Sequence, residues 1–293
     1  MKTIKVFIES YPLLIYFALV FAISWGGVLM VIGPSGILGT TEQAETLLPI
    51  AILAMLAGPS VAGFVLTGLL YGRAGFRDLL SRMRRWRVGA RWYAVALLTV
   101  PLLFTAVFLA LSLTSPEFLP GIFVSEDKAS VLLFGIAAGL MVGFFEELGW
   151  TGFAVPKLRL RHGILSTGLI VGVLWGAWHF LTNGVWASGT TSGELLLSLF
   201  LPAVLFTLLV GVLPAFRVLM VWVYERTDGS LLVAMLMHAS LTASTLILTP
   251  VVTGVAFLTY GLVLATAMWL VVGAVAVANG GHISRQPLRI RVA

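Results

Sequence analysis

Long runs of apolar residues are the feature of this sequence that most restricts its fold. A membrane-spanning helix needs roughly 20 predominantly apolar residues, and eight runs of about that length occur along the chain. Only helices and closed barrels satisfy their backbone hydrogen bonds in lipid, and the ten-residue alternation of barrel strands is absent from the sequence. We therefore expect an all-α, polytopic transmembrane helical bundle. The expected spans are 12–32, 49–71, 92–113, 129–155, 164–181, 195–216, 230–248 and 255–278.

The composition agrees with a membrane protein. Apolar residues make up 59% of the chain and charged residues only 10%, whereas about 25% of an ordinary soluble domain is charged. We expect residues 1–293 to form a single integral membrane domain, and the first apolar run is too long for a cleavable signal peptide. The chain has no cysteine, which excludes disulfides, cysteine-ligated zinc and thiol nucleophiles.

Basic residues mark one side of the expected bundle. Of the 18 lysines and arginines, 17 fall in the two termini and the even-numbered loops, with Arg217 and Arg226 assigned to the sixth loop. The positive-inside rule then places both termini in the cytoplasm, and we expect a prokaryotic plasma membrane. The arginines of segment 73–91 favour anionic lipid headgroups as partners, and no nucleic-acid partner is expected.

Four ionisable residues lie inside the expected spans: Glu146, Glu147, His179 and His238. Each costs about 2.5–3.5 kcal/mol on insertion scales, so each needs a functional or structural reason. Adjacent helical residues point about 100° apart. We therefore expect one glutamate to face the reacting centre, while the other reaches a neighbouring helix or orients a histidine.

These residue types can activate water for hydrolysis. A glutamate can act as general base, the histidines can polarise a carbonyl or carry the proton, and a hydroxyl or amide can stabilise an oxyanion. Glu146, His179 and His238 could instead hold a divalent metal such as zinc, because two histidines and one glutamate form known zinc sites. Buried glutamate and histidine also form proton relays, so a proton-coupled transporter is an alternative.

At these positions the sequence resembles the CAAX prenyl protease 2 and bacteriocin-processing family, or CPBP intramembrane proteases. The family motifs Glu-Glu-x-x-x-Arg, Phe-x-x-x-His and His-x-x-x-Asn are similar to segments 146–151, 175–179 and 238–242, in that order. The resemblance covers roughly residues 55–250. It implies an intramembrane endopeptidase that acts on a peptide or membrane-protein substrate.

Three positions depart from the family pattern: Thr151 replaces arginine, Trp175 replaces phenylalanine and Thr242 replaces asparagine. The Thr151 replacement removes a permanent cation from beside the glutamates, whereas Thr242 keeps a hydrogen-bond donor with a shorter reach. Thr151 and Thr242 favour the alternative of a non-catalytic membrane scaffold or bacteriocin self-immunity protein, whereas the exchange of one aromatic residue for another at Trp175 is tolerable.

The resemblance assigns a role to each candidate residue. Glu146 is the expected general base, supported by Glu147, while His179 and His238 polarise or bind the substrate and Thr242 contributes at the oxyanion.

The expected depths of these residues in the membrane differ. Counted from the cytoplasmic side at 1.5 Å per residue, Glu146 and His238 lie roughly 12–14 Å deep. His179 lies roughly 22 Å deep by the same count, which is too far outward for a straight span.

Overall fold

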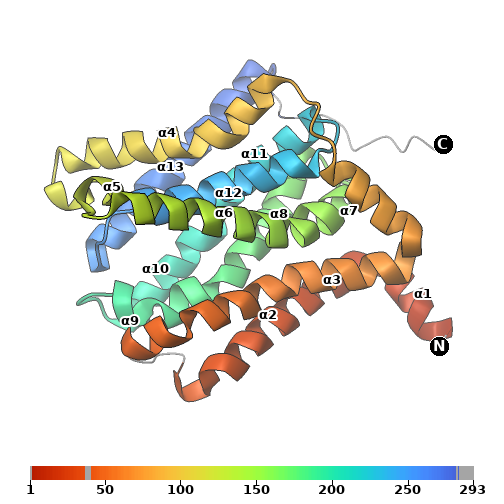
Figure 1. Ribbon diagram of the computed structural model, residues 1–293, viewed down its shortest axis with the longest axis horizontal. Helices are drawn as coiled ribbons and strands as arrows, with labels where there is room; N and C mark the ends of the chain where they lie inside the picture. The colour runs from red at the N-terminus through yellow and green to blue at the C-terminus, as the bar shows by residue number, and fades with distance from the viewer. Residues whose placement is uncertain (1, 37–40, 282, 284–293) are drawn as a thin grey trace.

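The computed structural model describes residues 2–36, 41–281 and 283, and the regular structure in those ranges is entirely helical (Figure 1). Eight segments of this described part are long and apolar enough to cross a membrane, and each overlaps one expected span. The all-α prediction is therefore confirmed, and the chain is an integral membrane protein. The helices of these segments are α2 (Pro12–Gly36), α3 (Thr41–Met83), α4 (Ala90–Ser112), α6 (Lys128–Gly149) with η2 (Trp150–Ala154) and α7 (Val155–Arg159), α8 (Ile164–His179) with η3 (Phe180–Trp186), α10 (Leu197–Val210) with α11 (Val212–Arg226), α12 (Leu231–Leu248) and α13 (Gly254–Ala278). The shorter helices are α1 (Lys2–Ser10), η1 (Pro116–Phe118), α5 (Gly121–Val124) and α9 (Ser188–Thr191).

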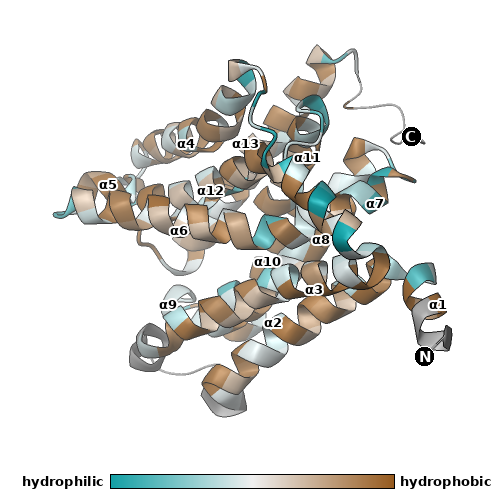
Figure 2. Ribbon diagram, turned by 45° about the vertical axis from the view of Figure 1, so that its right-hand side comes forward, coloured by the Kyte–Doolittle hydropathy of each residue, from teal (hydrophilic) through white to brown (hydrophobic). Residues whose placement is uncertain are grey.

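The connections alternate between the two ends of the bundle. In Figure 1, α1, the α3–α4 connection and α7 lie towards the right, whereas α5 and α9 lie towards the left. Figure 2 shows the long helices mostly in the colours of apolar residues, with hydrophilic segments at α7 and at the C-terminal end of α3, which leads to α4. This end of the bundle carries the arginines of segment 73–91. The arginines of the C-terminal tail, Arg285, Arg289 and Arg291, lie outside the described residues.

Glycines at four-residue spacing bring α6 and α12 close together. Gly135, Gly139 and Gly143 are buried on one face of α6, because residues four apart share a helix face. A Cβ atom added to Gly139 would lie 2.5 Å from the carbonyl oxygen of Ala239 in α12. Small residues at this spacing are typical of close helix packing in membranes. Glu147 is the next position of the same stripe and therefore faces α12.

A second glycine stripe joins α8 to α11. Gly168, Gly172 and Gly176 are buried along α8, and a Cβ atom on Gly172 would lie 2.5 Å from the Pro214 Cα and 3.2 Å from the Arg217 Cβ. The backbone of α11 therefore packs directly against α8. This contact brings Arg217 into the bundle beside the helix that carries His179.

The sixth span differs from the prediction. It continues to Arg226 and breaks at Gly211, whose φ of −87° and ψ of −132° are not helical. Arg217 therefore lies inside α11 with no exposed surface, and its assignment to a cytoplasmic loop was wrong. The run of apolar residues stops at Phe216, but helix α11 continues to Arg226. It can continue because a buried partner compensates the charge of Arg217.

The fourth span is also longer than expected, since its helical segment continues to Arg159. The expected fourth span ended at residue 155, which placed Arg159 in the loop that follows, yet Arg159 is buried and forms an ion pair with Glu225 across 2.8 Å. A charged residue can thus belong to a packed helix end when an acidic partner on another helix meets it.

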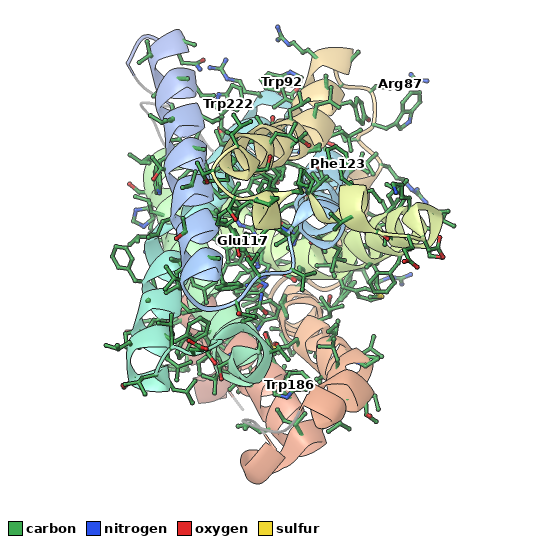
Figure 3. All side chains as sticks on the ribbon, turned by 90° about the vertical axis from the view of Figure 1, so that its left-hand side faces the viewer. Arg87, Trp92, Glu117, Phe123, Trp186 and Trp222 are labelled. Carbon is green, nitrogen blue, oxygen red and sulfur yellow. The ribbon has the colours of Figure 1, made fainter. Side chains whose placement is uncertain are left out.

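Aromatic residues join α4 to α11 near the end of the bundle that carries the arginines. The rings of Trp92 and Trp222 pack edge to face, with centroids 5.1 Å apart (Figure 3). The guanidinium of Arg87 lies over the ring of Trp86 instead of in the interior. Tryptophan and arginine at a helix end are typical of a membrane–water interface.

Candidate active site

The four ionisable residues predicted inside the spans lie on three helices, α6, α8 and α12. Glu146 and Glu147 lie in the last turn of α6, shortly before the π-helical turn η2, and His238 lies in α12; all three are buried. His179 is the last residue of α8 and is only partly buried, and a second π-helical segment, η3, follows it. π-helical turns frequently occur at functional sites, because they displace side chains from the regular helix positions.

Both oxygens of the Glu147 carboxylate are fully engaged. Nδ1 of His238 lies 2.6 Å from Oε1, and Nη1 of Arg217 donates to Oε1 and Oε2 at 2.9 and 2.8 Å. The hydroxyl of Thr151 also donates to Oε2. A buried carboxylate is costly unless it is paired and hydrogen-bonded. Glu147 therefore serves to connect α6, α11 and α12 and to fix the ring of His238.

Glu146 makes a different contact. The indole Nε1 of Trp175 donates to its Oε2 at 2.7 Å. The Trp175 ring also packs edge to face against His179 and His238, with centroids 5.3 and 5.0 Å away. Glu146, His179 and His238 thus all meet at one tryptophan.

Trp175 also contacts the cation of the site. The guanidinium carbon of Arg217 lies 4.3 Å from the centre of the Trp175 ring. Arg217 therefore bonds Glu147 directly and lies against the residue that holds Glu146. A cation over an indole face is favourable, and more so where water is excluded.

The hydrogen bonds of the two histidines orient their rings. Nδ1 of His179 lies 2.9 Å from the carbonyl oxygen of Trp175, and Nδ1 of His238 meets the Glu147 carboxylate. Both partners only accept hydrogen bonds, so Nδ1 is the donor in each ring. Within the described part of the chain, neither Nε2 atom has a hydrogen-bond partner, which leaves both for a substrate or a proton.

The depth that the sequence predicted for His179 was misleading. Because the fourth span ends at Arg159, Glu146 lies 13 residues from that end, close to the 15 residues that separate His179 from Ile164. His238 lies only seven residues after the start of α12. However, Thr227 and Ser230 in the preceding turn are buried, so α12 begins below the surface. The three residues can therefore meet without a kink in α8.

The side chains do not assemble a metal site as they stand. Across residues 2–36, 41–281 and 283, no group of three or more histidines, aspartates and glutamates is arranged to hold a metal ion. The Arg217 cation occupies both oxygens of Glu147. Glu147 is therefore already paired, and the predicted metal set of Glu146, His179 and His238 stays a prediction.

The two threonines have different surroundings. Thr151 bonds Glu147, whereas Thr242 is partly buried one turn after His238. Its hydroxyl makes no hydrogen bond with any other residue that the structure describes. The oxyanion role expected of Thr242 stays a prediction.

Sequence reasoning missed the role of Arg217. We expected the replacement of arginine by Thr151 to leave the glutamates without a cation, but Arg217 of α11 supplies one. An arginine directly after the predominantly apolar run 195–216 and before another apolar run was the available signal. Trp175 was interpreted only as an aromatic substitute, yet its indole N–H makes the bond to Glu146 that phenylalanine cannot make.

Fold and site together define a polytopic helical membrane protein with a buried glutamate, histidine and arginine cluster where α6, α8, α11 and α12 meet. Residues 128–244, which contain all of these residues, match the family described as type II CAAX prenyl endopeptidase Rce1-like. The predicted resemblance is therefore confirmed over this segment.

A curated relative supports the same assignment. The chain is 26% identical over 147 residues to CAAX prenyl protease 2 of Methanococcus maripaludis. The match covers 45% of this chain and 50% of the relative, so the chain spans about half of the length of that protein.

Proposed function

We propose that this protein is an intramembrane endopeptidase that hydrolyses a peptide bond with water activated by Glu146. The observation that carries the proposal is the convergence of Glu146, His179 and His238 on Trp175 inside the bundle. Ionisable residues are expensive in a membrane protein interior. Three of them around one point are better explained by chemistry than by packing.

Glu146 is the general base in this mechanism. Trp175 holds one oxygen of its carboxylate, and the other has no hydrogen-bond partner among the described residues. A water molecule bound there gives a proton to Glu146 while the water oxygen attacks the carbonyl carbon of the scissile bond. The carbonyl oxygen then carries the negative charge of the tetrahedral intermediate.

The histidines act on the substrate side. Nε2 of His179 and of His238 can donate to the developing oxyanion when protonated, or pass a proton to the leaving nitrogen as the C–N bond breaks. Thr242, one turn from His238, contributes a hydroxyl donor to the same oxyanion. The proton that Glu146 removed from water returns to the amine product, which restores the site.

Glu147 and Arg217 are positioning residues. Glu147 fixes Nδ1 of His238 as the donor, so that Nε2 is directed to the substrate. Arg217 neutralises the charge of Glu147, which leaves Glu146 as the carboxylate available for base catalysis. Two adjacent glutamates thereby take different roles.

The proposed substrate is a peptide that enters the bundle from the membrane or from its cytoplasmic side. The name of the matched relative makes a prenylated C-terminal CAAX peptide a direct probe. The protein should be reconstituted in liposomes with a fluorogenic CAAX peptide, with and without a farnesyl group, in the presence and absence of a chelator. Cleavage that survives the chelator would favour water activation by Glu146 without a metal.

The decisive variant is Glu146→Gln, which keeps the shape of the side chain and removes the base. We expect its rate to fall by about 10²–10⁴-fold, the usual contribution of general base catalysis. Glu194→Gln, at an exposed glutamate near the opposite end of the bundle, is the matched control and should cleave like the parent. Equal rates for the parent and Glu146→Gln would refute the proposal.

Thr242 favours one second candidate, a non-catalytic membrane scaffold or self-immunity protein, because it lacks the amide of the family motif. In that case no peptide is cleaved, and Glu146→Gln retains the cellular role of the parent. The same pair of variants therefore separates the two functions.

A further inference from the structure

A cavity of about 410 Å³ lies outside the candidate active site, between the last turns of α3 and the segment η2–α7. It lies at the end of the bundle that carries the arginine-rich segment, and none of the candidate catalytic residues lines it. Tyr71 and Leu160 on its rim are 50% and 47% exposed, so the cavity reaches the surface. Its lining includes Thr67, Tyr71, Asp78, Arg82, Phe153 and Lys157.

Lys157 is the unusual residue of this cavity. Its ammonium lies 3.5 Å from the centre of the Phe153 ring and 4.7 Å from that of Tyr71. The side chain is partly buried, and it forms no ion pair with any described residue. Aromatic faces attract a cation, but they do not neutralise it.

The other charges of the cavity are already paired. Arg82 donates through Nε to Asp78 at 2.9 Å, through Nη1 to the Tyr224 hydroxyl at 3.1 Å and through Nη2 to the Gly152 carbonyl at 2.8 Å. The carboxylate of Asp78, the acidic residue of the lining, thus accepts a hydrogen bond from Arg82 and compensates its charge. The cavity therefore keeps one uncompensated positive charge, on Lys157.

We propose that this cavity binds the phosphate group of an anionic lipid headgroup through Lys157. Lysine binds phosphate as a point charge, and basic pockets between membrane helices on the cytoplasmic side bind anionic headgroups. The exposed Tyr71 and Leu160 at the rim offer apolar contact to the glycerol and upper acyl region, while the uncompensated charge of Lys157 repels the choline of a zwitterionic lipid. This inference does not rest on the proposed peptidase activity.

The test compares two lipids with identical acyl chains on the purified full-length protein. Native mass spectrometry should show phosphatidylglycerol retained about five-fold more strongly than phosphatidylcholine, which corresponds to roughly 1 kcal/mol per basic residue. Lys157→Gln should abolish this preference, and Lys157→Arg should keep it. Arg161→Gln removes an exposed charge from the turn after α7 and should bind both lipids like the parent.

Circular dichroism and size-exclusion chromatography should show the same fold for all variants. An unchanged preference for phosphatidylglycerol in Lys157→Gln, or an equal loss in Arg161→Gln, would overturn the proposal. A further arm adds inorganic phosphate and follows thermal unfolding. Stabilisation by phosphate that requires Lys157, without any lipid preference, would assign the same cation to a free phosphate and overturn the lipid as its source.

Discussion

The ion pair between Arg217 and Glu147 gives the sharpest test of the interior of this protein. Both side chains have no exposed surface, and Nη1 of the arginine lies 2.8 Å from Oε2 of the glutamate. Arg217→Met keeps a long apolar side chain against Trp175 and leaves Glu147 as a buried, uncompensated carboxylate. Removing one partner of a buried pair typically costs about 3–5 kcal/mol, because the remaining charge stays desolvated.

That loss is measurable by the intrinsic fluorescence of the tryptophans during thermal unfolding in detergent. We expect the midpoint for Arg217→Met to fall on the order of 10 °C. Arg161→Met, at an exposed position, should leave it unchanged. Glu147→Gln in the Arg217→Met background should recover much of the loss, since no buried charge then remains.

Thr151 provides a second way to restore the pair. Its hydroxyl already bonds the Glu147 carboxylate, so an arginine introduced there can reach the same oxygens from η2. Thr151→Arg should therefore raise the unfolding midpoint of Arg217→Met, although it should lower that of the parent by adding a second cation. A midpoint for Arg217→Met within about 2 °C of the parent, or a Thr151→Arg effect of the same sign in both backgrounds, would refute the argument that Arg217 replaces the arginine of the family motif.

Three further outcomes follow from the structure. Gly139→Val would place a Cβ atom 2.5 Å from the Ala239 carbonyl oxygen, which is closer than van der Waals contact allows; we expect a lower unfolding midpoint and lost cleavage, while Gly273→Val, with open space around the added Cβ, should match the parent. Thr242→Val should slow cleavage by about 10²–10³-fold if its hydroxyl stabilises the oxyanion, whereas Thr242→Asn should preserve or raise the rate. Tags at both termini should be protected from external protease in intact cells, because the basic loops and both termini are expected on the cytoplasmic side; digestion of only one tag would remove one span from the topology.

The spans could be predicted because an apolar run is a local property of the sequence. A helix in lipid satisfies its own backbone hydrogen bonds, so length and hydropathy suffice to place it. The errors occurred where a charge had a distant partner. Arg217 marked the end of the expected sixth span, because its charge interrupts the apolar run. The helix continues beyond it because Glu147, 70 residues earlier, neutralises the charge of Arg217. Arg159 and Glu225 extended the fourth and sixth spans in the same way.

The candidate site was predictable in its residue types but not in its connections. Intramembrane Glu146, Glu147, His179 and His238 stand out because each is costly in an apolar segment. Nothing in the sequence states which glutamate meets which histidine. The glycine stripes decide it: Gly135, Gly139 and Gly143 bring α12 onto the face of α6 that ends in Glu147, so His238 bonds that glutamate. Glu146 lies about 100° around the helix and meets Trp175 of α8 instead. The different hydrogen-bond partners of the two adjacent carboxylates therefore follow from the spacing of glycines one to three turns earlier in α6.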